Sequence, residues 1–132
     1  MEVMPSKDFL ALNPGYSTSA GRSKYGNRKV EVGPFAFDSE AEAHRYQDLL
    51  LSVKAGVISG LFVHPSFELQ APFTDAAGSR HRGISYEGDF AYTEAGRVVV
   101  EDVKGVRTEV FRLKEKLFRF RYPSIDFRVI EL

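Results

Sequence analysis

The sequence contains no cysteine, no long hydrophobic run and no excess of charge of either sign. Without cysteine the chain can form neither a disulfide, nor a thiolate nucleophile, nor a cysteine-ligated zinc site. A helix that spans a bilayer needs about 20 predominantly apolar residues, and the N-terminal segment MEVMPSKDFLALNPG lacks the basic and then apolar pattern of a secretion signal. The three histidines share no metal-ligand spacing. We therefore expect a cytoplasmic protein that does not associate with membranes.

Basic residues are unevenly distributed, although the chain as a whole is neutral, with 18 basic and 18 acidic residues. The segment RSKYGNRK (22–29) has four basic residues and no acid, and residues 104–121 have seven basic residues against two acidic ones. Two interpretations fit such stretches: a surface that binds phosphate groups, or a solvated face without a partner.

The composition predicts one folded domain preceded by an arm. Apolar residues make up 43% of the chain and aromatic residues 13%, which is typical of a globule with a buried core. Residues 1–30 are rich in Gly, Ser, Pro and Lys and show little periodicity, so we expect a flexible basic N-terminal arm there. Residues 31–132 would then form the domain.

Hydrophobic spacing predicts the order helix, three strands, helix, strand. The helices are expected over 39–55 and 108–122, and the second should bury four apolar side chains: Val110, Leu113, Leu117 and Phe120. The strands are expected over 60–69 with a bend near Pro65, 84–92, 97–104 and 126–132. This order predicts an α+β fold, with two helices flanking a central mixed β-sheet.

Short connections are expected between these strands. Residues 74–83 should form a mobile hairpin loop, and the turn over 93–96 should pair the strands on either side of it antiparallel. Alternation in the strand over 84–92 should place four apolar side chains on one face: Ile84, Tyr86, Phe90 and Tyr92.

The strand RVVVEDVK (97–104) ends in charge after a run of valines that is typical of a buried strand. Alternation places Asp102 and Lys104 on one face and Glu101 on the other. The turn before this strand would bring Asp89 to the side of Asp102, and two converging carboxylates repel each other unless a cation lies between them. A divalent metal is one explanation; a structural salt-bridge network at a half-exposed strand end is the other.

Glu42 offers a third carboxylate, at the centre of the apolar stripe of the first helix. Two roles fit its position. As the last residue of Ser39-x-x-Glu42 it could form a capping box, or it could join the metal site, because an acid on a core-facing stripe needs a partner. Glu101 faces away from the other acids, and we expect it to support the site or to pair with a base such as Arg97.

Several short motifs of the sequence together resemble the PD-(D/E)xK nuclease superfamily: KYGNRK (24–29), FDSEAEAHRY (37–46), HPSFEL (64–69), YEGDF (86–90), VVEDVKG (99–105) and FRLKEK (111–116). More closely, they resemble a phage-associated family of small proteins of unknown function, similar to Holliday junction resolvases. This resemblance implies a restriction-endonuclease-like fold with an αβββαβ core.

The resemblance also implies roles for individual residues. Asp89 and Asp102 would be the motif acids, Lys104 the motif lysine and Glu42 the helix-borne acid, and these four would be the catalytic residues. Mg²⁺, or Mn²⁺ in its place, would be held by Asp89, Asp102, Glu42 and the main-chain carbonyl of Val103.

The substrate implied by the resemblance is branched or structured DNA in phage recombination or replication. The protein would act in the bacterial host cytoplasm, as an endonuclease, and would form a homodimer. We expect contacts with the DNA backbone from these residues: Arg22, Lys24, Tyr25, Arg28, Lys29, Arg112, Lys114 and Lys116. Of these, Lys114 would also reach back toward the site. The alternative is a DNA-binding or assembly module that keeps the fold without catalysis.

Overall fold

The computed structural model describes residues 17–18 and 29–131. These residues form a series of short strands and two helices. In chain order they are β1 (Ser17–Thr18), β2 (Val30–Val32), β3 (Phe35–Phe37), α2 (Glu40–Lys54), β4 (Ser59–Val63), β5 (Pro65–Gln70), β6 (Phe73–Thr74), β7 (Arg80–His81), β8 (Ile84–Glu87), β9 (Phe90–Glu94), β10 (Arg97–Lys104), α3 (Glu109–Arg121) and β11 (Asp126–Glu131).

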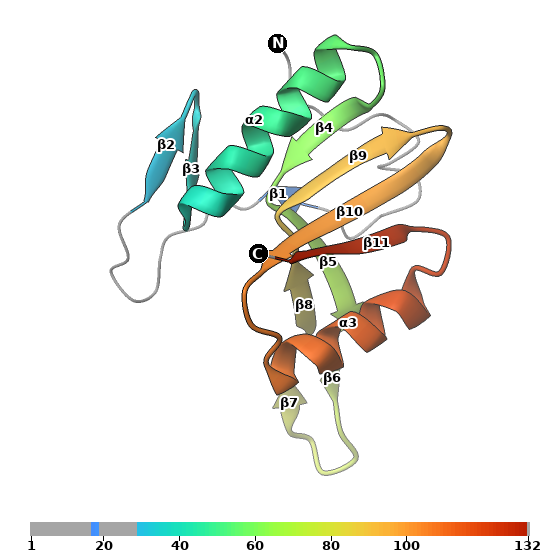
Figure 1. Ribbon diagram of the computed structural model, residues 1–132. Helices are drawn as coiled ribbons and strands as arrows, with labels where there is room; N and C mark the ends of the chain where they lie inside the picture. Colours follow the sequence, from blue (N-terminus) through green and yellow to red (C-terminus); the bar gives the residue numbers. More distant parts are fainter. Residues whose placement is uncertain (1–16, 19–28, 132) are drawn as a thin grey trace.

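The central sheet has the strand order β11-β10-β9-β4. Strand β10 runs parallel to β11 and antiparallel to β9, and β9 is antiparallel to β4, so the sheet is mixed. The two helices lie on opposite faces (Figure 1), because Val99 packs in the core cluster beside α2 whereas Val98 and Val100 pack in the cluster beside α3. The predicted α+β class, with two helices around a mixed sheet, is confirmed.

Two of the predicted strands are each divided into two. The predicted strand over 60–69 breaks at His64, which has a φ of 55°, and the one over 84–92 breaks at Gly88. Both breaks lie at the same level, since the His64 amide donates to the Asp89 carbonyl at 2.9 Å and the Gly88 amide to the Pro65 carbonyl at 2.9 Å. The two-stranded ribbon therefore bends as a unit out of the central sheet.

Beyond the bend, β5 and β8 form a second sheet with β1. Gly88 permits the close packing there, because a Cβ at this position would lie 3.1 Å from Cγ1 of Val100. The bend also overturns the predicted single face of the strand over 84–92. Tyr86 belongs to the core cluster beside α3, whereas Phe90 and Tyr92 belong to the cluster beside α2.

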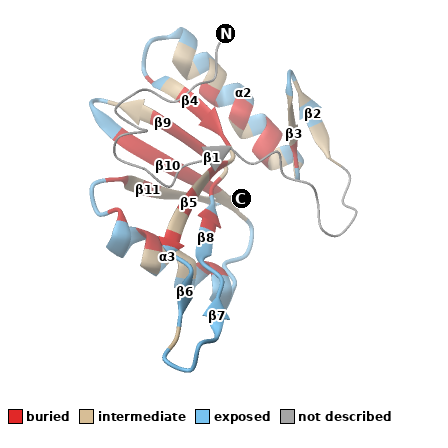
Figure 2. Ribbon diagram, turned by 180° about the vertical axis from the view of Figure 1, so that it is seen from behind, coloured by how far each residue is buried: buried red, intermediate tan, exposed pale blue. Residues whose placement is uncertain are grey.

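Helix α2 confirms the predicted helix over 39–55. Ser39 is its N-cap and accepts a hydrogen bond from the Glu42 amide at 3.2 Å. The helix buries Glu42, Ala43, Tyr46 and Leu49. Burial is concentrated along β9 and β10 between the two helices, and the β6–β7 hairpin is mostly exposed (Figure 2).

Helix α3 has the expected position but turns a different face to the core than predicted. Val110, Leu113 and Phe120 are exposed, and the buried residues are Phe111 and Phe118. Of the predicted stripe, Leu117 alone packs against the core, where it is partly buried. The aromatic core decides between the two stripes, because the Phe118 ring lies within about 5 Å of three other rings: Phe67 at 4.9 Å, Tyr122 at 5.1 Å and Phe127 at 5.1 Å.

This orientation predicts opposite outcomes for two neighbouring phenylalanines. Phe118→Ala should lower the free energy of unfolding by about 3–5 kcal/mol, because it leaves a cavity in a core site that is 0% exposed. Phe120→Ala should change it by no more than about 0.5 kcal/mol, because that side chain is 86% exposed. Urea unfolding of both variants measures the difference, and equal losses would contradict the orientation of α3.

The turn expected over 93–96 is present. Ala95 and Gly96 both have positive φ, of 51° and 78°, and the flanking strands pair antiparallel, Arg97 opposite Glu94. Residues 74–83 contain the loop and the second strand of the β6–β7 hairpin, as expected. Of the predicted N-terminal arm, Ser17–Thr18 pair with β5 and Lys29 and Val30 are described; its other residues lie outside the described part. Within the described residues, neither helix combines the length and apolarity that a membrane crossing requires.

Candidate functional site

Asp89 lies where β10 extends past the end of its pairing with β9. The Asp89 amide donates to the Glu101 carbonyl at 3.0 Å, and the Val103 amide donates to Oδ2 of Asp89 at 2.6 Å. The aspartate side chain thus takes the place of a backbone acceptor at the strand end. This arrangement brings the Asp89 carboxylate next to Asp102, so that each aspartate affects the pKa of the other.

Asp102 is almost fully buried, with 2% of its surface exposed, and each of its oxygens has a partner. The Tyr86 hydroxyl, from β8, donates to Oδ2, and the Lys104 ammonium lies 3.3 Å from Oδ1. Lys104 itself lies 4.7 Å above the Phe111 ring of α3. The lysine is therefore held between the carboxylate and an aromatic face, with its side chain 32% exposed.

Glu42 enters the site from the first turn of α2. The Ser39 hydroxyl donates to Oε2 of Glu42 at 3.1 Å, so the capping contact is made through the serine side chain. Glu42 also hydrogen-bonds with the carboxyl group of Asp89. Glu42 thus contacts its N-cap residue and also approaches Asp89; its predicted place in a metal site stays a prediction.

The two aspartates of the cluster, Asp89 and Asp102, both bind a proton more tightly than a free carboxyl group does. Burial raises the pKa of Asp89 well above its ordinary value, and the hydrogen bond with Glu42 and the charge of Asp102 raise it further. Burial also raises the pKa of Asp102, against the opposing effects of Tyr86 and Lys104. The site therefore retains a proton more readily than isolated carboxyl groups would.

The donor chemistry of this cluster fits a hard divalent cation, because all its donors are oxygens and their mutual repulsion would be relieved by positive charge. Within residues 17–18 and 29–131, no group of three His, Asp or Glu side chains is already disposed around one ion position. Val103 belongs to the site through its amide, and the role predicted for its carbonyl stays a prediction.

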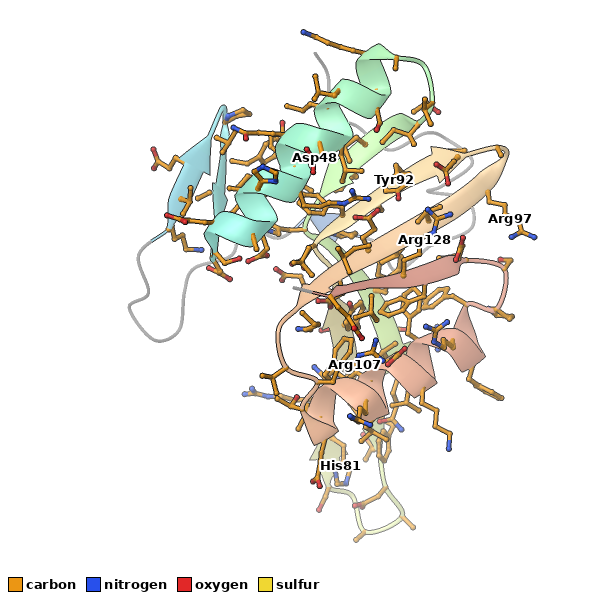
Figure 3. All side chains as sticks on the ribbon, viewed as in Figure 1. Asp48, His81, Tyr92, Arg97, Arg107 and Arg128 are labelled. Carbon is orange, nitrogen blue, oxygen red and sulfur yellow. The ribbon has the colours of Figure 1, made fainter. Side chains whose placement is uncertain are left out.

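Glu101 lies on the opposite face of β10, fully buried beneath α2. It pairs with a base, as expected, but the base is Arg45 and not Arg97: the Arg45 guanidinium donates to both carboxylate oxygens, at 2.8 and 2.6 Å. The Tyr92 hydroxyl donates to Oε2 as well. Arg97 lies at the β9–β10 turn, at the far end of the strand (Figure 3).

Sequence reasoning missed Arg45 and Tyr86. Arg45 follows Glu42 by three residues and so lies on the same side of α2, which was a usable signal. Tyr86 had no such signal, because its direction depends on the bend at Gly88.

The basic residues expected to contact DNA are scattered. Lys114 donates to the Ser85 carbonyl at 2.9 Å, Lys116 and Arg112 are exposed on α3, and Lys29 pairs with Asp38 at 3.3 Å. The remaining four lie outside the described residues: Arg22, Lys24, Tyr25 and Arg28.

The fold and the site define an α+β domain with a buried carboxylate cluster beside a lysine. A family model described as "Protein of unknown function (DUF1064)" matches residues 22–131, and the chain belongs to this family. Neither a search of curated proteins nor a search of solved structures returns a match.

Proposed function

We propose that the protein is a Mg²⁺-dependent endodeoxyribonuclease of the PD-(D/E)xK type, acting on branched or structured DNA. The observation that carries this proposal is the meeting of Asp89, Asp102 and Glu42 beside Lys104. They come from three separate segments: the β8–β9 connection, β10 and the first turn of α2. Buried acids that repel each other lower the stability of the fold. A bound cation relieves this repulsion, and cation binding is a common function of such clusters.

Each residue has a role in the proposed reaction. Asp89, Asp102, Glu42 and the Val103 carbonyl would hold Mg²⁺ or Mn²⁺, which neutralises phosphate charge and makes water a better nucleophile at neutral pH. Tyr86 orients the Asp102 carboxylate through its hydrogen bond. Lys104, set against Asp102, is positioned to bind a phosphate oxygen and to stabilise negative charge that develops there.

The setting of this activity is part of the proposal. By its resemblance to phage-associated, resolvase-like proteins, the enzyme acts in the bacterial cytoplasm during phage recombination or replication. Symmetric cutting of a four-way junction requires two active sites, which a homodimer supplies. Recognition rests mainly on contacts with the DNA backbone. Because such contacts carry no sequence information, the enzyme selects its substrate by the shape of the DNA and not by its base sequence.

A cleavage panel tests the proposal. Duplex, single-stranded and four-way DNA are incubated with the protein in Mg²⁺, Mn²⁺ or EDTA. We expect cleavage of the four-way DNA that requires the metal and falls by about a thousandfold or more in Asp102→Ala, because a charge-neutralising ligand is lost. Glu87→Gln, which removes an exposed acid of β8, is the matched control. No cleavage of any substrate, or equal cleavage by Asp102→Ala, would overturn the proposal.

The second candidate is a DNA-binding or assembly module without catalysis. It is favoured by the protein donors that already occupy Oδ2 of Asp89 and Oδ2 of Asp102. Junction binding that is independent of metal, together with a failed cleavage panel, is the result expected for it.

A further inference from the structure

A basic depression adjoins the carboxylate cluster on the side of the Lys104 ammonium. It has a volume of about 510 Å³ and is lined by residues that follow β10, begin α3 and end β11: Lys104, Gly105, Val106, Arg107, Arg112 and Glu131. Figure 3 shows Arg107 in this place, past the end of β10 and near the start of α3. The depression is therefore contiguous with the proposed active site through a shared residue, Lys104.

The charges in this depression are unequally satisfied. Arg107 donates to Oε1 of Glu131 at 2.7 Å, so the one acid of the lining is already neutralised. Lys104 has a partner in Asp102. The Arg112 guanidinium is exposed, and nothing in the described part of the chain pairs with it. A cationic group thus lines a hollow with no protein acid to match it.

We propose that this depression binds a phosphate of the DNA backbone that neighbours the phosphate being cut, with Arg112 as its principal ligand. The inference rests on the proposed function and adds a subsite to it. A guanidinium suits this role, because its planar donors match two phosphate oxygens at once. Since Lys104 faces both the carboxylate cluster and the depression, a strand held by Arg112 is aligned across the reacting centre.

DNA binding without turnover tests the subsite. Binding of four-way DNA in EDTA is followed by fluorescence anisotropy between about 50 and 200 mM salt. Arg112→Ala should weaken binding about tenfold and reduce the slope of log K against log salt by about 1, the value for one phosphate contact. Arg112→Lys should recover the slope but only part of the affinity, because it keeps the charge and loses the bidentate geometry.

Arg97→Ala is the matched control. Arg97 is exposed at the opposite end of β10, so its loss removes the same charge far from the depression. The control should leave the salt slope unchanged. Equal effects of Arg112→Ala and Arg97→Ala would overturn the subsite, since they would reflect net charge alone.

The source of the phosphate is resolved by substitution in the DNA. A neutral methylphosphonate is placed at one linkage after another near the cut. At one linkage it should weaken binding by the wild-type protein and leave the DNA affinity of Arg112→Ala unchanged. If millimolar inorganic phosphate competes with DNA for binding, and no methylphosphonate linkage weakens binding, the assignment to a backbone phosphate is overturned.

The subsite and the nuclease proposal can fail separately. If the wild-type protein cleaves no DNA, but Arg112→Ala weakens DNA binding as expected, the nuclease proposal is overturned and the subsite is supported. If the wild-type protein cleaves DNA in a metal-dependent way, but Arg112→Ala binds and cleaves DNA as wild type does, the nuclease proposal is supported and the subsite is overturned.

Discussion

Asp89→Asn is expected to reduce DNA cleavage by about a thousandfold or more and, in the same protein, to increase stability in the absence of metal at neutral pH. The two effects have one cause. Asparagine keeps an oxygen that can accept the Val103 amide, but it removes a negative charge that contacts Glu42 and Asp102. Loss of that charge weakens metal binding and also relieves repulsion among buried acids.

The pH dependence of stability should carry the same signature. An unfolded aspartate has a pKa of about 3.9, and burial, with Glu42 and Asp102 nearby, raises the pKa of Asp89 above that value in the folded state. Between the two values the folded protein binds more protons than the unfolded chain, so stability falls as pH rises from about 4 through the raised pKa and then levels. Asp89→Asn should remove the part of this fall that Asp89 contributes and leave a smaller one from Asp102, whose pKa burial also raises.

Thermal unfolding between about pH 4 and 8, in EDTA and in Mg²⁺, measures both expectations. In wild type, Mg²⁺ should raise the midpoint temperature chiefly at the higher pH values, where the carboxyl groups are charged. Glu87→Gln should behave as wild type throughout. A stability curve for Asp89→Asn that parallels wild type in EDTA would contradict the repulsion that we describe.

Arg45→Ala is expected to lower the free energy of unfolding by about 3–5 kcal/mol, because it leaves the Glu101 carboxylate buried without its cation. Glu101 is 0% exposed, and among the residues that the structure describes it would retain only the Tyr92 hydroxyl as a donor to its side chain. The double variant Arg45→Met with Glu101→Leu should be clearly more stable than Arg45→Ala, since both charges are then removed together.

Chemical denaturation of these variants, with Gln47→Ala as an exposed control on α2, measures the effect. Arg45 also lies three residues after Glu42, so the ion pair fixes α2 against β10 at the level of the acidic cluster. Arg45→Ala should therefore lose cleavage activity even at temperatures where it stays folded. A loss of stability below about 1 kcal/mol would indicate that the pair contributes as little as a surface salt bridge.

The bends and the choice of helix face depended on contacts between distant segments. The apolar stripe Val110–Leu113–Phe120 and the pair Phe111–Phe118 are both compatible with helical spacing, and only the aromatic rings supplied by β5 and β11 select the second. Likewise, the division of the strand over 84–92 follows from the fit of Gly88 against Val100.

The sequence by itself determined the positions of both helices, the β9–β10 turn and the two faces of β10, because caps, turn residues and alternation act over a few residues. Those faces already separated Asp102 from Glu101. Only the tertiary structure decided that Tyr86 reaches Asp102, 16 residues away, and that Arg45 reaches Glu101, 56 residues away. Partners at such separations are selected by packing, which no local pattern records.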